Sequence, residues 1–224
     1  NPTGSVYSMA ELEAFAEILG KRDEIYILSD EIYEYINYTG GHASIASIPS
    51  VRDQTITVNG FSKGFAMTGW RLGYIGAPKE VAKATDKMQG QFTSGAASFS
   101  QKAAALALDT ELSETHKMKE VFQQRRDLIL GLLKEIPGVK CNTPDGAFYV
   151  FPDVSSYYGK KTEDGTTIEN GDQLCEYILE KAYVALVAGS AFGADECIRI
   201  SYAASDKDII ESCRRLKEVL EKLK

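Results

Sequence analysis

The sequence predicts an α/β fold in which a mainly parallel sheet is followed by a smaller α+β domain. An apolar run without alternation at residues 25–28 is typical of a strand covered on both faces, and a β-branched run at residues 55–58 indicates a second strand. A helical pattern precedes the first run, and a long helical pattern at residues 113–136 separates two differently organised halves. We therefore expect residues 1–112 to form part of a large domain, and residues 113–224 to form the linking helix and a small C-terminal domain.

The first half of the chain contains one well-delimited helix and three strand-like runs. Ser8 and Glu11 have the spacing of a capping box, in which each side chain bonds the other's backbone, so a helix should begin after Ser8. Gly20 is a natural end for that helix. Its apolar positions recur at helical spacing, at Leu12, Phe15, Ala16 and Leu19. The strand-like runs lie at residues 25–28, 55–58 and 70–75.

The second half of the chain mixes helices with short strands. Its long first helix should end at the Pro137-Gly138 pair, because proline cannot continue a helix. A strand, a polar insertion and a second helix follow, and then two short strands and an amphipathic C-terminal helix. These segments lie at residues 147–151, 157–171, 172–182, 184–187, 198–203 and from Asp206 onward.

Composition restricts the class of protein. The 224 residues are 44% hydrophobic and 25% charged, which is ordinary for a globular protein with a real core. The excess of 32 acidic over 25 basic residues gives a net charge of −7, which argues against nucleic-acid binding through a basic face. We see no run of 18 apolar residues and no charged-then-apolar leader, so we expect neither a membrane span nor a signal peptide.

The cysteines, the histidines and the first residues carry three further expectations. Four cysteines without a CxxC pair, together with two histidines, argue against a metal site and against a disulfide scaffold. A reducing, cytoplasmic setting is therefore expected. The chain opens with Asn1-Pro2-Thr3-Gly4 and no initiator methionine, and such turn signals normally follow a strand. We expect a sizeable N-terminal part to precede them.

The densest chemical signal is a glycine-rich block between two predicted strands. It carries Lys63 and Arg71, eight residues apart, and its glycines allow close approach of the backbone to a ligand. An enclosed lysine loses its proton more easily and can form a Schiff base, and arginine offers a planar fork suited to phosphate. Taken on these two residues alone, a surface loop with two solvated cations is the commoner alternative.

Two further segments carry polar residues at predicted strands. Asp30 falls at the carboxyl end of a strand, where open α/β sheets place ligands, and Tyr33 follows it. A carboxylate there can pair with a cationic ring nitrogen or can simply cap the next turn. In the run around Arg199, Ile198 and Ile200 share one face and Arg199 lies on the other, where it lines a polar cleft or is exposed.

Four motifs in order resemble those of a known family. They are Asn1-Pro2-Thr3-Gly4, Asp30-Glu31-Ile32-Tyr33, the block from Ser62-Lys63 to Arg71-Leu72-Gly73, and Arg199. Together they resemble the signatures of class I pyridoxal-phosphate (PLP) aminotransferases of the aspartate aminotransferase type. The resemblance covers essentially the whole chain but only about the second half of a typical family member. It implies the C-terminal part of a PLP-dependent transferase fold.

The resemblance implies a role for each residue that meets the cofactor ring. Lys63 would hold PLP as a Schiff base and, once freed by an incoming amino acid, would move the proton between the substrate and the cofactor. Asp30 would stay ionised against the pyridinium nitrogen. Tyr33 and Asn1 would donate hydrogen bonds to the 3′-oxygen of the cofactor.

The resemblance also implies which residues hold the two anionic groups. Arg71 would bind the phosphate, helped by Ser62, although some relatives place this serine three residues before the lysine, where this chain has Gly60. Arg199 would bind the α-carboxylate of the substrate in a two-pronged salt bridge, with Asn1 beside the substrate.

The function implied is transfer of an amino group from aspartate to 2-oxoglutarate, in a protein that is a homodimer at full length. An aromatic or branched-chain aminotransferase and a C–S lyase remain open as alternatives, because the specificity pocket lies mostly upstream in the family. A fragment that binds PLP weakly or not at all, or a ligand-sensing module, is the non-enzymatic alternative. Neither nucleic acid nor a membrane is expected as a partner.

Overall fold

The computed structural model describes residues 1–224, which divide into two compact units. One unit, called here the 6–119 unit, is Val6–Lys119; the other, the 120–224 unit, is Glu120–Lys224 together with Asn1–Ser5. The division falls within helix α4 (Ser113–Lys134). The sequence-based domain boundary in front of that helix stays a prediction. No helix combines the length and the apolar character needed to span a membrane.

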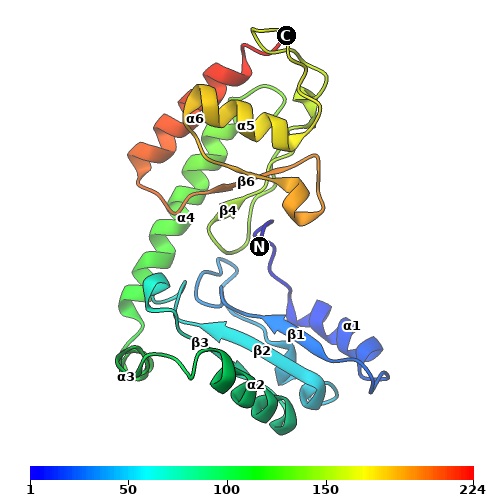
Figure 1. The fold of residues 1–224 in the computed structure, drawn as a ribbon, viewed down its shortest axis with the longest axis vertical. Helices are drawn as coiled ribbons and strands as arrows, with labels where there is room; N and C mark the ends of the chain where they lie inside the picture. The colour runs from blue at the N-terminus through cyan, green and yellow to red at the C-terminus, as the bar shows by residue number, and fades with distance from the viewer. The chain divides into compact units, whose positions relative to one another are not determined.

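The 6–119 unit is built on a three-stranded sheet in the order β1-β2-β3 (Figure 1). The strands are β1 (Ile27–Asp30), β2 (Thr55–Gly60) and β3 (Gly73–Gly76). β1 and β2 are parallel, whereas β2 and β3 are antiparallel. The sheet is therefore mixed rather than mainly parallel among these strands, because the short connection between β2 and β3 has no crossover helix, which a parallel pairing would require.

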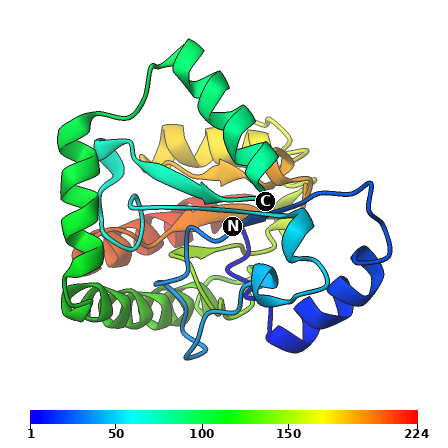
Figure 2. The same ribbon diagram turned by 90° about the horizontal axis from the view of Figure 1, so that it is seen from below.

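Three helices complete the 6–119 unit. They are α1 (Met9–Leu19), α2 (Lys79–Phe92) and α3 (Ser98–Asp109). α1 and α2 lie on opposite sides of the strands, as Figure 2 shows most clearly. The predicted capping box is confirmed, since Glu11 N donates to Ser8 Oγ at 3.3 Å and Ser8 N donates to Glu11 Oε2 at 2.8 Å. Neither α2 nor α3 was predicted from the sequence.

Two strand expectations in this unit need correction. β1 begins at Ile27 rather than at residue 25, and its burial alternates along the strand. Leu28 is 70% exposed, so the expectation of a strand covered on both faces is wrong for this face. The predicted strand at residues 70–75 starts only at Gly73, because Thr68–Trp70 forms a 3₁₀ turn.

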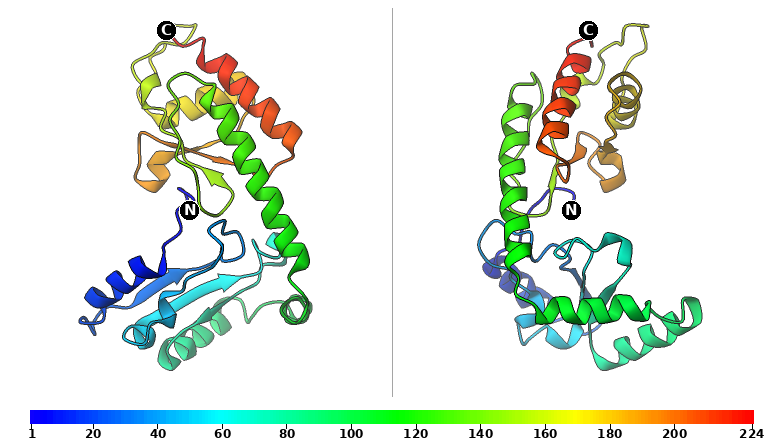
Figure 3. Two further views of the ribbon diagram at one scale, coloured as in Figure 1. Left: turned by 180° about the vertical axis from the view of Figure 1, so that it is seen from behind. Right: turned by 90° about the vertical axis from the view of Figure 1, so that its left-hand side faces the viewer.

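The 120–224 unit contains an antiparallel sheet and the larger apolar core. The strands are β4 (Tyr149–Val150), β5 (Val187–Ala188) and β6 (Ile198–Ser201), in the order β4-β6-β5. The helices are α5 (Gly171–Ala182), α6 (Asp206–Leu220) and the greater part of α4. α6 runs beside α4 in both views of Figure 3, and Arg125 Nε donates to Asp206 Oδ1 at 2.9 Å between them. Leu174, Ile178 and Tyr202 are fully buried in the core.

Candidate functional site

The parallel pair β1 and β2 brings two predicted site residues to one edge of the sheet. Asp30 is the last residue of β1 and lies opposite Val58, while Lys63 follows the end of β2 at Gly60. Glu31 N donates to Val58 O at 2.8 Å, which continues the pairing just beyond Asp30. Because the two strands are parallel, both residues lie at the carboxyl edge, where open α/β sheets bind ligands.

The segments that follow β1 and β2 pack directly against each other. A Cβ added to Gly64 would lie 2.4 Å from Tyr35 Cδ2, so the backbone next to Lys63 lies against the Tyr35 ring. The rings of Tyr35 and Phe65 meet edge to face at 5.3 Å between centroids. A Cβ added to Gly60 would lie 3.4 Å from Ile32 Cδ1. The Asp30 and Lys63 segments are thus one packed assembly.

The backbone around Lys63 is closed by hydrogen bonds. Ala66 N donates to Lys63 O at 3.2 Å in a turn that gives Ala66 a left-handed φ of 53°. Phe61 N donates to Leu72 O at 3.3 Å, and Met67 N donates to Phe61 O at 3.1 Å. Lys63 itself is half-buried. These contacts give the lysine a defined place, unlike a freely solvated loop cation.

Arg71 lies further along the same loop, in a more open setting. It is exposed, has a left-handed φ of 51° and donates from Nη1 to Thr68 O at 3.0 Å. It lines a cavity of about 720 Å³, a volume in the range of ligand sites. The other residues that line this cavity are Ala66, Gly69, Trp70, Gln89, Thr93, Gly95, Ala96, Ala97, Phe99 and Ser100. Ser62, the remaining predicted phosphate-binding residue, lies beside Lys63 and is half-buried.

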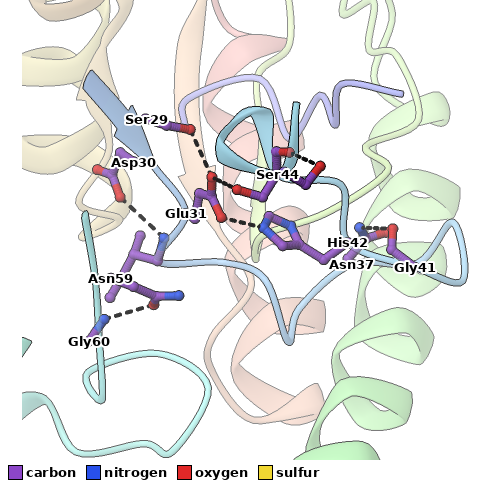
Figure 4. Close-up of polar contacts among 11 residues, drawn as sticks. Ser29, Asp30, Glu31, Asn37, Gly41, His42, Ser44, Asn59 and Gly60 are labelled. Atoms are coloured by element: carbon purple, nitrogen blue, oxygen red, sulfur yellow. Dashed lines mark hydrogen bonds and ion pairs between the residues drawn. The ribbon is translucent and has the colours of Figure 1, made fainter. Parts of the chain in front are cut away.

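The carboxylate of Asp30 makes a local contact with the turn that follows it. Asp30 Oδ1 accepts a hydrogen bond from Ile32 N at 3.2 Å (Figure 4). This is the turn-capping contact that the sequence left open as an alternative. A carboxylate has acceptor capacity for several hydrogen bonds, so the cap is compatible with a second partner. Tyr33, half-buried, follows in the same turn.

The 120–224 unit brings together the two remaining predicted site residues. Arg199 Nη1 donates to Asn1 Oδ1 at 2.8 Å, although the residues lie 198 positions apart in the chain. The Arg199 guanidinium lies 4.4 Å from the ring centroid of Tyr149 and 4.8 Å from that of Phe192. The prediction that Ile198 and Ile200 share one face of β6 and Arg199 lies on the other is confirmed, because Ile198 and Ile200 are buried and Arg199 is only half-buried.

One polar cluster beside Asp30 went unrecognised in the sequence. Figure 4 shows Ser29, His42 and Ser44 pointing toward the carboxylate of Glu31. Glu31 is 8% exposed and accepts three hydrogen bonds, from Ser29 Oγ at 3.0 Å, from Ser44 Oγ at 2.7 Å and from His42 Nε2 at 2.7 Å. Its partners span a long loop without a recognisable spacing, so only the presence of an acidic residue directly after Asp30 could have drawn attention to it.

The residues present fit PLP. The cofactor needs an amine for its aldehyde, an anion for its ring nitrogen and a cation for its phosphate. Lys63 and Asp30 lie at one sheet edge, with their segments packed together, and Arg71 follows on the loop that Lys63 begins. No group of three or more histidine, cysteine, aspartate or glutamate side chains is placed to hold a metal ion.

The fold and the site together define an α/β protein with a lysine and a carboxylate at the carboxyl edge of parallel strands. The chain belongs to the aminotransferase class I and II family, whose model matches residues 1–216. Family membership confirms the resemblance that the sequence motifs indicated, and it implies PLP as the cofactor.

Two plant proteins and one crystal structure illustrate the similarity. The chain is 52% identical over its whole length to a Petunia hybrida bifunctional aspartate aminotransferase and glutamate/aspartate-prephenate aminotransferase, covering 48% of that protein. Over 92% of its length it is 54% identical to an aspartate aminotransferase of Pinus pinaster, covering 42% of it. The crystal structure of the aspartate aminotransferase from Rhizobium meliloti superposes with a TM-score of 0.95 at 40% identity.

That structure matches the whole of this chain, which covers 56% of it. The chain thus spans about half the length of the relatives it matches. The predicted α/β fold, as part of a PLP-dependent transferase fold, is confirmed by this superposition.

Proposed function

We propose that this chain is the cofactor-binding and substrate-binding part of a PLP-dependent aminotransferase that moves an amino group from aspartate to 2-oxoglutarate. The observation that carries the proposal is the placement of Asp30 and Lys63 at the carboxyl edge of two adjacent parallel strands, Asp30 at the end of β1 and Lys63 just beyond β2, with the following segments packed together. The names of the relatives support aspartate as the donor. Because the chain spans about half of those relatives, the activity is proposed for the protein at the relatives' full length.

PLP supplies an aldehyde that condenses with amines and a pyridinium ring that accepts electrons. Lys63 would bind the cofactor through Nζ. Once displaced by the incoming amino acid, its free amine would take the α-proton from the substrate and deliver it to the cofactor. Both roles need a neutral amine on a long stem, and the closed loop around Lys63 restricts where that amine can reach.

The other residues of the 6–119 unit would bind and orient the cofactor. Asp30 would hold a proton on the ring nitrogen by charge attraction. Tyr33 would donate a hydrogen bond from its phenolic hydroxyl group to the 3′-oxygen of the cofactor. Arg71 would bind the phosphate as a bidentate donor, with the Ser62 hydroxyl as a further donor.

In the 120–224 unit, Arg199 would bind the α-carboxylate of the substrate. Its guanidinium is already oriented by Asn1 Oδ1 and flanked by the rings of Tyr149 and Phe192. Such a pre-oriented arginine loses less side-chain entropy when it binds a carboxylate. Asn1 would contact the substrate and the 3′-oxygen as well.

The test is covalent trapping. The 224-residue chain is incubated with PLP, its absorbance spectrum is recorded, the adduct is reduced with borohydride and the labelled lysine is mapped. We expect a visible band that bleaches on reduction and a label on Lys63. Lys63→Ala should lose the band, whereas Lys79→Ala, on the exposed start of α2, should keep it. A label on another lysine, or a soluble chain without a band, would count against a PLP site in this chain.

A second acceptor is prephenate, which the name of the Petunia hybrida relative includes. A comparison of 2-oxoglutarate with prephenate as amino acceptor in the whole protein would distinguish the two acceptors.

We further propose a cytoplasmic homodimer at full length, acting on a small amino acid and a 2-oxo acid without nucleic acid or membrane partners.

A further inference from the structure

We propose that Glu31 and His42 form a positioning pair that fixes the segment after β1 and thereby aims Asp30 and Tyr33 at the cofactor. This inference rests on the proposed PLP function and extends it to two residues that touch neither cofactor nor substrate in the arrangement proposed above. The relevant contacts all lie within the 6–119 unit.

The Glu31 carboxylate connects three places in the chain through hydrogen bonds. Ser29 belongs to β1, His42 lies in the loop that follows, and Ser44 directly precedes a 3₁₀ turn, Ile45–Ser47. That turn is anchored in turn, because Ile45 is buried against α1 in the small apolar cluster of this unit. A single buried carboxylate therefore connects the end of β1 to an anchored point more than ten residues further on.

Asp30 and Tyr33 both lie in the segment that these hydrogen bonds hold in place. Asp30 directly precedes Glu31, and within the turn Glu34 N donates to Glu31 O at 3.0 Å and Ile36 N donates to Tyr33 O at 2.8 Å. Ile36 is completely buried, which fixes the far end of the turn. A shift of the Glu31 backbone would therefore be passed to the neighbouring aspartate and to the tyrosine two residues later.

The remainder of the loop is held by a second, separate amide. Asn37 Nδ2 donates to Gly41 O at 2.8 Å (Figure 4). Thr39 donates to Asn37 Oδ1 from its backbone N at 2.9 Å and from Oγ1 at 2.7 Å. This amide shapes the tip of the loop and makes no contact with Glu31. Loss of the Glu31 contacts should therefore loosen the base of the loop, where Asp30 lies, while the tip keeps its turn.

The charge of the buried Glu31 carboxylate is compensated by its hydrogen-bond donors. Burying a carboxylate is costly unless hydrogen bonds compensate it, and an apolar side chain would fill the same space without that cost. Here three donors satisfy the carboxylate, and the His42 ring, 28% exposed, faces Glu31 with the charge of Glu34 also acting on it. On β3, burial raises the pKa of Tyr74, and the charges of Glu34 and Glu31 raise it further. The buried Glu31 carboxylate, satisfied by these donors, therefore fixes the geometry of the segment after β1.

The experiment compares PLP affinity with folding stability in the whole protein. PLP dissociation constants are measured by absorbance titration, and the melting temperature is measured without PLP. Glu31→Ala should weaken PLP binding by about tenfold, the low end of what loss of an orienting partner costs at metal sites. Glu31→Gln keeps an acceptor oxygen for Ser29 and Ser44 and should restore most of the affinity.

The matched control is Thr55→Val. Thr55 is buried in the same sheet and donates one hydrogen bond to Val51 O at 2.7 Å, so its loss lowers stability without touching the segment after β1. It should leave PLP affinity unchanged at a comparable loss of melting temperature. His42→Gln, at a more exposed position, provides a variant that folds if Glu31→Ala does not, and it should also weaken PLP binding.

The results distinguish a failure of the positioning role of Glu31 and His42 from a failure of the proposed PLP function. Equal effects of the Glu31 variants and Thr55→Val on PLP affinity would assign the pair a purely structural role and overturn the inference. Unchanged affinity in both Glu31→Ala and His42→Gln would do the same. If borohydride leaves no label on Lys63 in the unmodified protein, the proposed function itself fails, and the inference falls with it.

Discussion

Gly64 lies against the ring of Tyr35, and an added Cβ would be 2.4 Å from Cδ2 and 3.1 Å from both Cβ and Cγ of that tyrosine. Gly64→Ala therefore forces the ring or the Lys63 turn to move, at a cost of about 1–3 kcal/mol typical of overpacking. We expect a lower melting temperature and less PLP adduct. Gly69→Ala is the control in the same loop, because nothing lies within 4 Å of a Cβ there. Equal effects of the two variants would contradict the close packing.

The Glu31–His42 pair also predicts a pH dependence of stability. The hydrogen bond with Glu31 and the charges of Glu31 and Glu34 raise the pKa of His42, although burial lowers it. Burial raises the pKa of Glu31, but the hydrogen bonds from His42, Ser44 and Ser29 outweigh it and the net pKa is lowered.

The two pKa shifts stabilise the folded chain in different pH ranges. A raised histidine pKa contributes stability that is complete below the unfolded value of 6.5 and is lost as pH rises through the folded value. A lowered glutamate pKa contributes stability that is complete above 4.5 and is lost as pH falls through the folded value. The pair therefore stabilises most between pH 4.5 and 6.5.

Thermal unfolding from pH 5.5 to 8.5 is the measurement. The melting temperature should fall as His42 loses its proton, and both His42→Gln and Glu31→Gln should flatten that part of the curve. A curve that keeps its slope in both variants would place the titration elsewhere.

At the scale of elements, the end of α5 carries a residue in an unfavourable conformation. Tyr183 caps the helix with a left-handed φ of 56°, donates from its backbone N to Leu179 O at 3.1 Å and is 81% exposed. Glycine adopts this conformation freely, so Tyr183→Gly should stabilise the chain by up to about 1 kcal/mol. Thermal unfolding checks this. Tyr183→Ala keeps the strain and should bring no gain, so equal gains from both variants would refute the argument.

Local sequence patterns were sufficient to predict some helix and strand boundaries but not others. Ser8 and Glu11 were sufficient to place the start of α1, because a capping box consists of contacts three residues apart. The start of β3 was misplaced, because the apolar character of Trp70 and Leu72 does not reveal the 3₁₀ turn at Thr68–Trp70. α2 was not predicted, although Val81, Ala84, Met88 and Phe92 recur at helical spacing in its sequence. None of its residues is buried in the structure.

For the whole molecule, burial predicts an uneven local stability. α2 has no buried residue and exposes Met88 and Phe92, whereas Leu174 and Ile178 of α5 are fully buried. Elements with few buried contacts open at low free energy. Hydrogen–deuterium exchange followed by mass spectrometry should therefore show faster exchange of α2 amides than of α5 amides. Equal protection would mean that another surface covers α2 in solution.

The sequence by itself determined the family of this chain and the places of the segments that carry its predicted site residues. The Lys63 block, Asp30 at a strand end and the capped α1 depend on neighbours within a few residues, so short patterns contain the information. The order of these motifs along the chain was sufficient to indicate the family.

Only the tertiary structure decided which residues meet. Asn1 reaches Arg199 across 198 positions, and Glu31 finds His42 and Ser44 across a loop. Gly64 is required because the Tyr35 ring occupies the place of its side chain. These contacts depend on how strands pair and on which surfaces are buried together. No local pattern contains that information, since the same residues at the same spacing in another fold would face different partners.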